Sequence, residues 1–264
     1  MSPLGPRSVA PALSFGVAIL ISLAASDASA YCRMTTEGGA QVGNQPCVEE
    51  GPPLFWRTPC LSYAIDRRGS NWMTDEALED AVNAGFATWE AADCGGNETP
   101  NLVYKPSTEP STCTRAEFNN SGNVNTVAFL DPWIDPCADS DDPGYEPLAF
   151  AVTIVWFDPE SGEILDADMM VNDTQATSRN AGGPYADCPL SGCQGNDADL
   201  QSIITHEAGH FIGIGHSEDE DATMFASAER ESVSKRTLAQ DDINAVCEIY
   251  PPGSLDDSCD ATPI

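Results

Sequence analysis

The spacing of apolar residues changes several times along the chain, and after residue 60 it predicts short strands. Residues 61–66 alternate apolar and polar side chains, which is typical of a half-buried strand. Short apolar runs bounded by turn-forming residues predict four further strands, over residues 102–104, 126–130, 149–157 and 164–171. Residues 158–162, Asp-Pro-Glu-Ser-Gly, predict the turn between the last two strands.

Three other segments have the spacing of helices. Thr74 has the character of an N-cap, two acidic residues follow it, and apolar residues then recur at mostly helical intervals through residue 92. A second helix is predicted from about residue 197 onward, and a third over about residues 238–250, where two prolines end it. A few strands with three helices in one domain predict the α+β class, or a mixed α/β one. Segments rich in Pro, Asn, Ser and Asp predict loops over residues 106–124, 131–147 and 173–198.

The first thirty residues differ in composition from the rest of the chain. Arg7 precedes an apolar run over residues 9–25, and Ala28-Ser29-Ala30 supplies small residues of the kind that a signal peptidase needs. A membrane anchor is the alternative, but the run is short for a spanning helix and lacks a basic flank. We therefore predict a signal peptide over residues 1–30. No later segment is long and apolar enough to span a bilayer.

The rest of the chain is predicted to have three parts. Residues 31–59 contain cysteines, glycines and prolines without a clear period, which indicates an irregular, disulfide-tied N-terminal extension. Residues 60–252 hold all the predicted strands and helices and are long enough for one domain with a substantial core. Residues 253–264 are left as a short C-terminal tail.

All 10 cysteines follow the predicted cleavage site, which fits export into an oxidising compartment. Their even number predicts up to five disulfides, whose connectivity the sequence leaves open. Cys188 and Cys193 are close enough in sequence to favour a bridge that staples a loop. A cysteine zinc site is the alternative, but such sites usually show paired C-x2-C spacings, and none occurs here.

The formal charge of −31 disfavours two classes of partner. Such a surface repels nucleic acid and anionic lipid, so we expect the protein to bind neither nucleic acid nor membranes. A solvated acidic surface is the favoured interpretation, and attraction of cationic substrates or divalent ions is the alternative. The hydrophobic content of 41% disfavours a disordered chain.

The strongest chemical signal is the segment His-Glu-Ala-Gly-His-Phe-Ile-Gly-Ile-Gly-His over residues 206–216, which holds all 3 histidines of the chain. A helix places His206 and His210 on one face, one turn apart, where two imidazoles can reach one zinc ion. Gly213 lets the chain leave the helix and return His216 as a third ligand. Three protein ligands leave a position open for water, and Glu207 is placed to act as general base. Chance histidines on a glycine-rich helix end are a far weaker explanation of this spacing.

This segment resembles the signature HExxHxxGxxH of the metzincin zinc peptidases, in which a methionine turn follows. Met224 is suitably placed for that turn, although an ordinary core methionine is the plain alternative. Ser217 and residues 238–246 resemble the matrixin branch, the relatives of matrix metalloproteinases. The specific resemblance covers about residues 198–252.

The resemblance implies a metzincin-like α+β catalytic domain, whose twisted sheet has an antiparallel edge, with three main helices. It implies a secreted, zinc-dependent endopeptidase that cleaves protein or peptide substrates by Glu-assisted attack of a zinc-bound water. Substrate is expected to lie extended along an edge strand near residues 148–151, and residues 225–237 to shape the pocket beyond the scissile bond. We expect the protein to be a monomer.

The sequence also departs from the matrixin pattern. Phe150 stands where a structural-zinc histidine is usual, and no histidine is spare, so one catalytic zinc is expected and not two. No matrixin-like propeptide cysteine motif is found, which leaves latency through a zinc-bound cysteine without support. Asp139, Asp141 and Asp142 favour a structural calcium ion, although an acidic chain forms such clusters by chance equally well. The alternative function is a non-catalytic, disulfide-stapled surface or calcium-binding module with a relict zinc site.

Overall fold

The computed structural model describes residues 30–39, 47–107, 111, 115–119, 123–135 and 144–253 of the chain. Almost all of the predicted signal peptide and tail lie outside the described residues, and so do Asp139, Asp141 and Asp142 of the predicted calcium cluster. Within the described ranges, no helix combines the length and the apolar character needed to cross a membrane.

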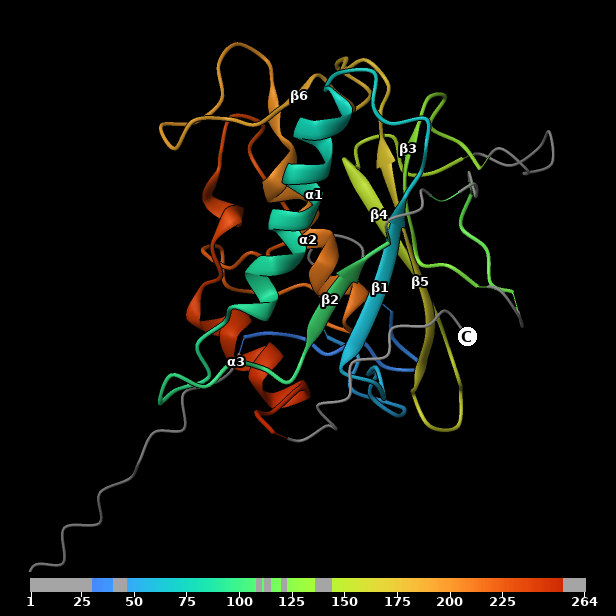
Figure 1. Cartoon of the computed structure of the whole chain (residues 1–264), viewed down its shortest axis with the longest axis vertical. Coiled ribbons are helices and arrows are strands. Elements are labelled where there is room, and N and C mark those ends of the chain that lie inside the picture. Colours follow the sequence, from blue (N-terminus) through green and yellow to red (C-terminus); the bar gives the residue numbers. More distant parts are fainter. Residues whose placement is uncertain are drawn as a thin grey trace, which may run out of the picture.

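A five-stranded mixed sheet forms one layer of the molecule (Figure 1), in the order β2-β1-β3-β5-β4. The strands β1, β2, β3 and β5 run parallel, whereas β4 is antiparallel to β5 and occupies one edge. The predicted α+β class with an antiparallel sheet edge is thereby confirmed. The strands span β1 Cys60–Ile65, β2 Val103–Pro106, β3 Thr126–Leu130, β4 Ala151–Phe157 and β5 Ile164–Asn172.

The three predicted helices are present as α1 Asp75–Glu90, α2 Leu200–Phe211 and α3 Gln240–Ile249. Thr74 caps α1 as expected, because its side chain accepts a hydrogen bond from the N–H of Ala77. The second helix begins later than the predicted residue 197, since Asp199 caps it by accepting from the N–H of Ser202. The preceding residues instead form β7 Ala198–Asp199, which pairs with β6 Tyr185–Ala186.

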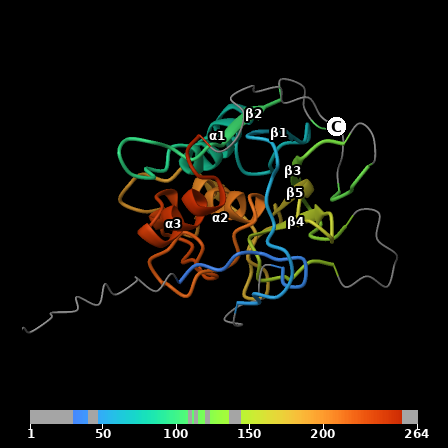
Figure 2. The same ribbon diagram turned by 90° about the horizontal axis from the view of Figure 1, so that it is seen from below.

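The main core lies between the sheet and the layer that contains α1 and α2 (Figure 2). Phe86 of α1 is at its centre, with its ring stacked on Tyr63 at 4.1 Å between centroids and edge-on to Phe211 of α2 at 5.3 Å. Gly85 lets the two helices approach closely, because a Cβ there would stand 2.6 Å from Cγ2 of Ile204. A smaller apolar cluster covers the opposite face of β3 and β5.

The N-terminal extension is tied by the disulfide Cys32–Cys47 and packs against the segment that follows α2. The N–H of Met34 donates to the carbonyl of Gly213 at 2.9 Å, and the N–H of Gly215 donates to the carbonyl of Cys32 at 2.7 Å. The extension therefore braces the stretch of chain that leads to His216.

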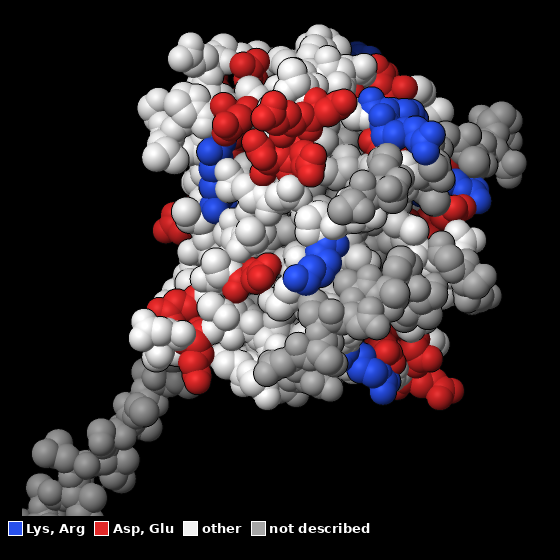
Figure 3. Space-filling model, viewed as in Figure 1, with Lys and Arg blue, Asp and Glu red and all other residues white. Residues whose placement is uncertain are grey.

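Two further disulfides connect described cysteines. Cys188 is bonded to Cys193, which confirms the predicted loop staple. Cys94, just after α1, is bonded to Cys247 in α3. Cys60 is also disulfide-bonded. The acidic character of the chain is visible on the face drawn in Figure 3, where Asp and Glu side chains gather over the N-terminal end of α1.

Candidate metal centre

Helix α2 and the turn after it place the three histidines. His206 and His210 lie one turn apart on α2, which ends at Phe211. Gly213 has φ 89°, and a Cβ there would lie 2.8 Å from the carbonyl oxygen of Leu54. Only glycine fits both the backbone conformation and the space at this position, so the turn that returns His216 depends on it.

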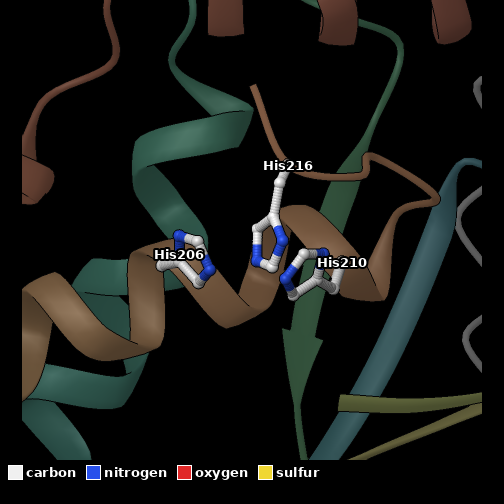
Figure 4. A group of neighbouring side chains, drawn as sticks. All are labelled: His206, His210 and His216. Carbon is white, nitrogen blue, oxygen red and sulfur yellow. The ribbon is translucent and has the colours of Figure 1, made fainter. Parts of the chain in front are cut away.

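The structure brings the three predicted ligands together (Figure 4). Their ring centroids are 4.9 Å apart for His206 and His210, 5.3 Å for His206 and His216, and 4.8 Å for His210 and His216. One nitrogen from each ring lies within 4.8 Å of the others, close enough for one metal ion to bind all three. A second group with metal-like spacing, Cys188, Cys193 and Asp199, is a false candidate because both cysteines are disulfide-bonded.

Hydrogen bonds fix the orientation of two of the rings. Nδ1 of His206 is 2.7 Å from the carbonyl oxygen of Thr223, and Nδ1 of His210 is 2.8 Å from that of Ile214. A carbonyl oxygen only accepts, so both Nδ1 atoms carry the proton and both Nε2 atoms keep a free lone pair. With Nδ1 protonated and hydrogen-bonded in this way, Nε2 is the atom that each ring can offer to a metal ion.

The surroundings also keep these rings neutral. Burial lowers the pKa of His206 well below its ordinary value, and the positive charge of Lys235 acts in the same direction. Burial lowers the pKa of His210 to about 3. Neutral imidazoles with inward lone pairs fit a zinc ion, which is most often held by nitrogen and sulfur ligands.

Glu207 lies beside the histidines and is buried. The hydroxyl of Thr153 on β4 donates a hydrogen bond to its Oε2 at 2.7 Å. Burial raises the pKa of Glu207 to about 7, although the Thr153 hydrogen bond and the charge of Lys235 oppose that shift. A carboxyl group with a pKa near neutrality is suited to accept a proton and give it away again.

Met224 is buried and lies in a turn that follows the three histidines in sequence. A Cβ on Gly209 of α2 would stand 2.2 Å from its sulfur, so the turn packs directly against the helix. The Asp242 carboxylate accepts hydrogen bonds from the N–H groups of Thr223 and Met224, at 2.7 and 3.0 Å. Lys235 donates to the carbonyl oxygens on either side of Met224, those of Thr223 and Phe225.

Sequence reasoning missed Thr153, Lys235 and Asp242 as members of the site. Thr153 is the single polar residue of β4, and Lys235 is one of only two lysines in the chain. Those compositional oddities were the available signals, but neither reveals which groups the side chains contact. Asp242 belongs to the segment that resembles the last matrixin helix. The sequence does not reveal that its side chain also accepts hydrogen bonds from the methionine turn.

The loop over residues 225–237 is bound to the segment that carries β6. Arg230 donates hydrogen bonds to the carbonyl oxygens of Ala181 and Gly182, and its guanidinium lies 5.3 Å from the ring centre of Phe150. Phe150 immediately precedes the edge strand β4. Phe150, which the sequence resemblance places at the position of a structural-zinc histidine, therefore packs against a cation from the loop predicted to shape the pocket.

A helix that carries two histidines, a glycine turn that returns a third, and a methionine turn packed against the helix are together characteristic of the metzincin class of zinc peptidases. The described residues of this chain have the same arrangement. The family model described as Matrixin matches residues 140–251, which run from just before β4 to just beyond α3. Over this stretch the chain is similar to the matrixin family.

Several metalloproteinases resemble the chain over a short region. Metalloendoproteinase 1-MMP of Arabidopsis thaliana is 41% identical over 66 residues, which are 25% of this chain and 18% of that protein. Metalloendoproteinase 1 of Glycine max is 44% identical over 52 residues, or 20% of this chain and 17% of that protein. Interstitial collagenase B of Mus musculus is 43% identical over 56 residues, or 21% of this chain and 12% of that protein. The aligned region thus spans less than a fifth of each of these relatives.

Proposed function

We propose that the protein is a secreted zinc-dependent endopeptidase that hydrolyses peptide bonds in protein or peptide substrates. The observation that carries the proposal is the convergence of three histidine side chains beside the buried carboxyl group of Glu207. The match of residues 140–251 to the matrixin family model supports the same reaction class.

In this proposal His206, His210 and His216 hold one catalytic zinc ion through one ring nitrogen each. The bound zinc would supply Lewis acidity for a peptide carbonyl and make water acidic enough to attack near neutral pH. Glu207 would accept the proton of the attacking water and deliver it to the leaving amine. Met224 would support the site by packing, without ligating the metal.

The edge strand β4 is the proposed binding place for substrate. Within the described residues only β5 pairs with β4, so the backbone groups along its other side are available to an extended peptide. Residues 225–237 would form the wall beyond the scissile bond, held by the contacts of Arg230.

Export, domain limits and oligomeric state also belong to the proposal. We propose cleavage of a signal peptide over residues 1–30, which the disulfides of the described region support. The extension over residues 31–59, the catalytic domain over 60–252 and the tail over 253–264 complete the proposed organisation of a monomer. A structural calcium ion stays a prediction, since its candidate ligands lie outside the described residues.

The test combines metal analysis with peptide cleavage. Protein purified from the medium should contain zinc and cleave members of a mixed peptide library, and a zinc chelator should abolish the cleavage. Protein that keeps stoichiometric zinc but cleaves nothing would favour the alternative, a non-catalytic module with a relict zinc site.

A further inference from the structure

The edge strand β4 carries a hydroxyl group on a face that is otherwise apolar. Its sequence, AVTIVWF, contains one polar residue, Thr153. Side chains alternate along a strand, so Thr153 points to the same face as Ala151, Val155 and Phe157, which pack in or against the main core. A valine would satisfy the strand and the packing equally well, so the hydroxyl calls for another explanation.

The partner of this hydroxyl is Glu207. The Oγ1 atom of Thr153 lies 2.7 Å from Oε2 of the carboxyl group and 3.2 Å from the main-chain oxygen of the same residue. A hydroxyl has one proton to donate, and the shorter distance assigns it to Oε2. Among the described residues, no hydrogen bond to the other carboxyl oxygen, Oε1, is observed.

We infer that Thr153 is a positioning residue for the reaction, which fixes Oε2 of Glu207 so that Oε1 alone takes the proton of the attacking water. This inference rests on the proposed peptidase function. It assigns β4 two roles, because its outer edge would bind the substrate backbone while its inner face holds the general base. The substrate backbone and the general base would then both be positioned by the same strand.

The kinetic test compares three variants. Thr153→Val keeps the branched shape and removes the hydroxyl. It should lower kcat about 10–100-fold, the range found for residues that hydrogen-bond the groups of a metal site without binding the metal. Zinc content and KM should change little. Thr153→Ser restores a hydroxyl and should recover most of the lost kcat.

The matched control is Thr126→Val. Thr126 is a buried strand threonine of the same sheet whose Oγ1 donates to the carbonyl of Val124 at 3.1 Å and does not touch Glu207. It should lose stability without the fall in kcat. An unchanged kcat in Thr153→Val, an equal fall in Thr126→Val, or no recovery in Thr153→Ser would overturn the inference.

A stability cycle tests the contact without using activity. In metal-free protein, Thr153→Val should shift the denaturation midpoint more in the wild-type background than in a Glu207→Ala background, where the carboxyl partner is already gone. Thr126→Val should shift it equally in both. Additive shifts for Thr153→Val would overturn the contact. Wild-type protein that holds zinc and cleaves no peptide would instead overturn the proposed function, whatever the cycle shows.

Discussion

Glu207 illustrates how neighbouring groups set the chemistry of a single side chain. Burial pushes its pKa up to about 7, and the Thr153 hydroxyl and the Lys235 charge pull it down. The Glu207→Gln variant keeps the shape and removes the base, so it should retain one zinc ion and the fold while kcat falls about 10²–10⁴-fold. Cleavage assays with a peptide from the library measure kcat, and metal analysis measures the zinc content. Full activity with stoichiometric zinc would falsify the assignment of the base.

His216 tests the ligand set at the same scale. His216→Ala removes one of three protein ligands. Zinc affinity should therefore fall by more than the roughly 10–100-fold seen when a residue that only hydrogen-bonds a ligand is mutated. The competing site would use two histidines and a carboxylate from the loop after the methionine turn. Glu229→Ala is therefore the control, and competition with a metal chelator is the measurement. If Glu229→Ala loses zinc while His216→Ala keeps it, the three-histidine assignment is wrong.

Helix α2 depends on a glycine in its interior. Gly209 faces Met224 and Trp89, and a Cβ there would lie 2.2 Å from the methionine sulfur and 2.8 Å from Cζ2 of the tryptophan. Gly209→Ala should therefore destabilise the protein by about 1–3 kcal/mol through overpacking, despite the higher helix propensity of alanine. Denaturant unfolding measures the loss. The reference is Ala87→Gly at an exposed position of α1, which should cost about 1 kcal/mol through helix propensity alone. Gly95→Ala cannot serve as a control, because Gly95 has φ 99°.

Strand β5 contains two buried carboxyl groups on the face away from the main core. Burial raises the pKa of Asp166 to about 8 and that of Asp168 to about 7, and mutual repulsion contributes to the shift of Asp166. In the unfolded chain both groups titrate near 3.8. The folded state therefore binds more protons in between, so stability should fall as pH rises from about 4 toward 8 and change little above that.

Asp166→Asn removes the ionisation and can keep the hydrogen bond from Asn123 through its amide oxygen. The variant should be more stable than the wild type by about 1–3 kcal/mol near pH 8.5, with the difference shrinking toward pH 5. Urea unfolding at both pH values measures it. A difference that does not depend on pH would contradict the assigned ionisation.

The elements show where sequence reasoning succeeds and where it stops. Long periodic segments such as α1 were predicted nearly to the residue, because Thr74 supplies a local cap and the apolar stripe is regular. The paired strands β6 and β7 were missed, because a strand of two residues is too short to show an alternation of apolar and polar side chains. The start of β4 was placed two residues early, because apolar residues continue back from Ala151 into the preceding turn.

The site divides in the same way. The spacing of the three histidines is local information, so their convergence could be predicted from one helix and one turn. The contact between Thr153 and Glu207 joins residues 54 positions apart, and the burial of Asp168 depends on a polar loop that donates the N–H of Glu117 to it. Such contacts follow from the tertiary fold, which composition and periodicity do not supply.

The whole molecule should hold one tightly bound zinc ion per chain. All 3 histidines are committed to the candidate centre. The disulfide sulfurs of the described region are not thiolate ligands, and the ring of Phe150 cannot replace an imidazole. Elemental analysis after extensive dialysis tests the count, and two retained zinc ions would show that cysteines or acidic loops bind a second one.

The bridge between Cys94 and Cys247 spans 153 positions of sequence. It closes a covalent ring that contains four of the five sheet strands, the helix with its two histidines, His216 and the methionine turn. A single cut anywhere within the ring therefore leaves two pieces that stay joined, with every member of the site still attached. If the protein is the exported endopeptidase proposed above, it would meet other endopeptidases, including copies of itself, and this disulfide would keep a nicked chain in one piece until the medium turns reducing.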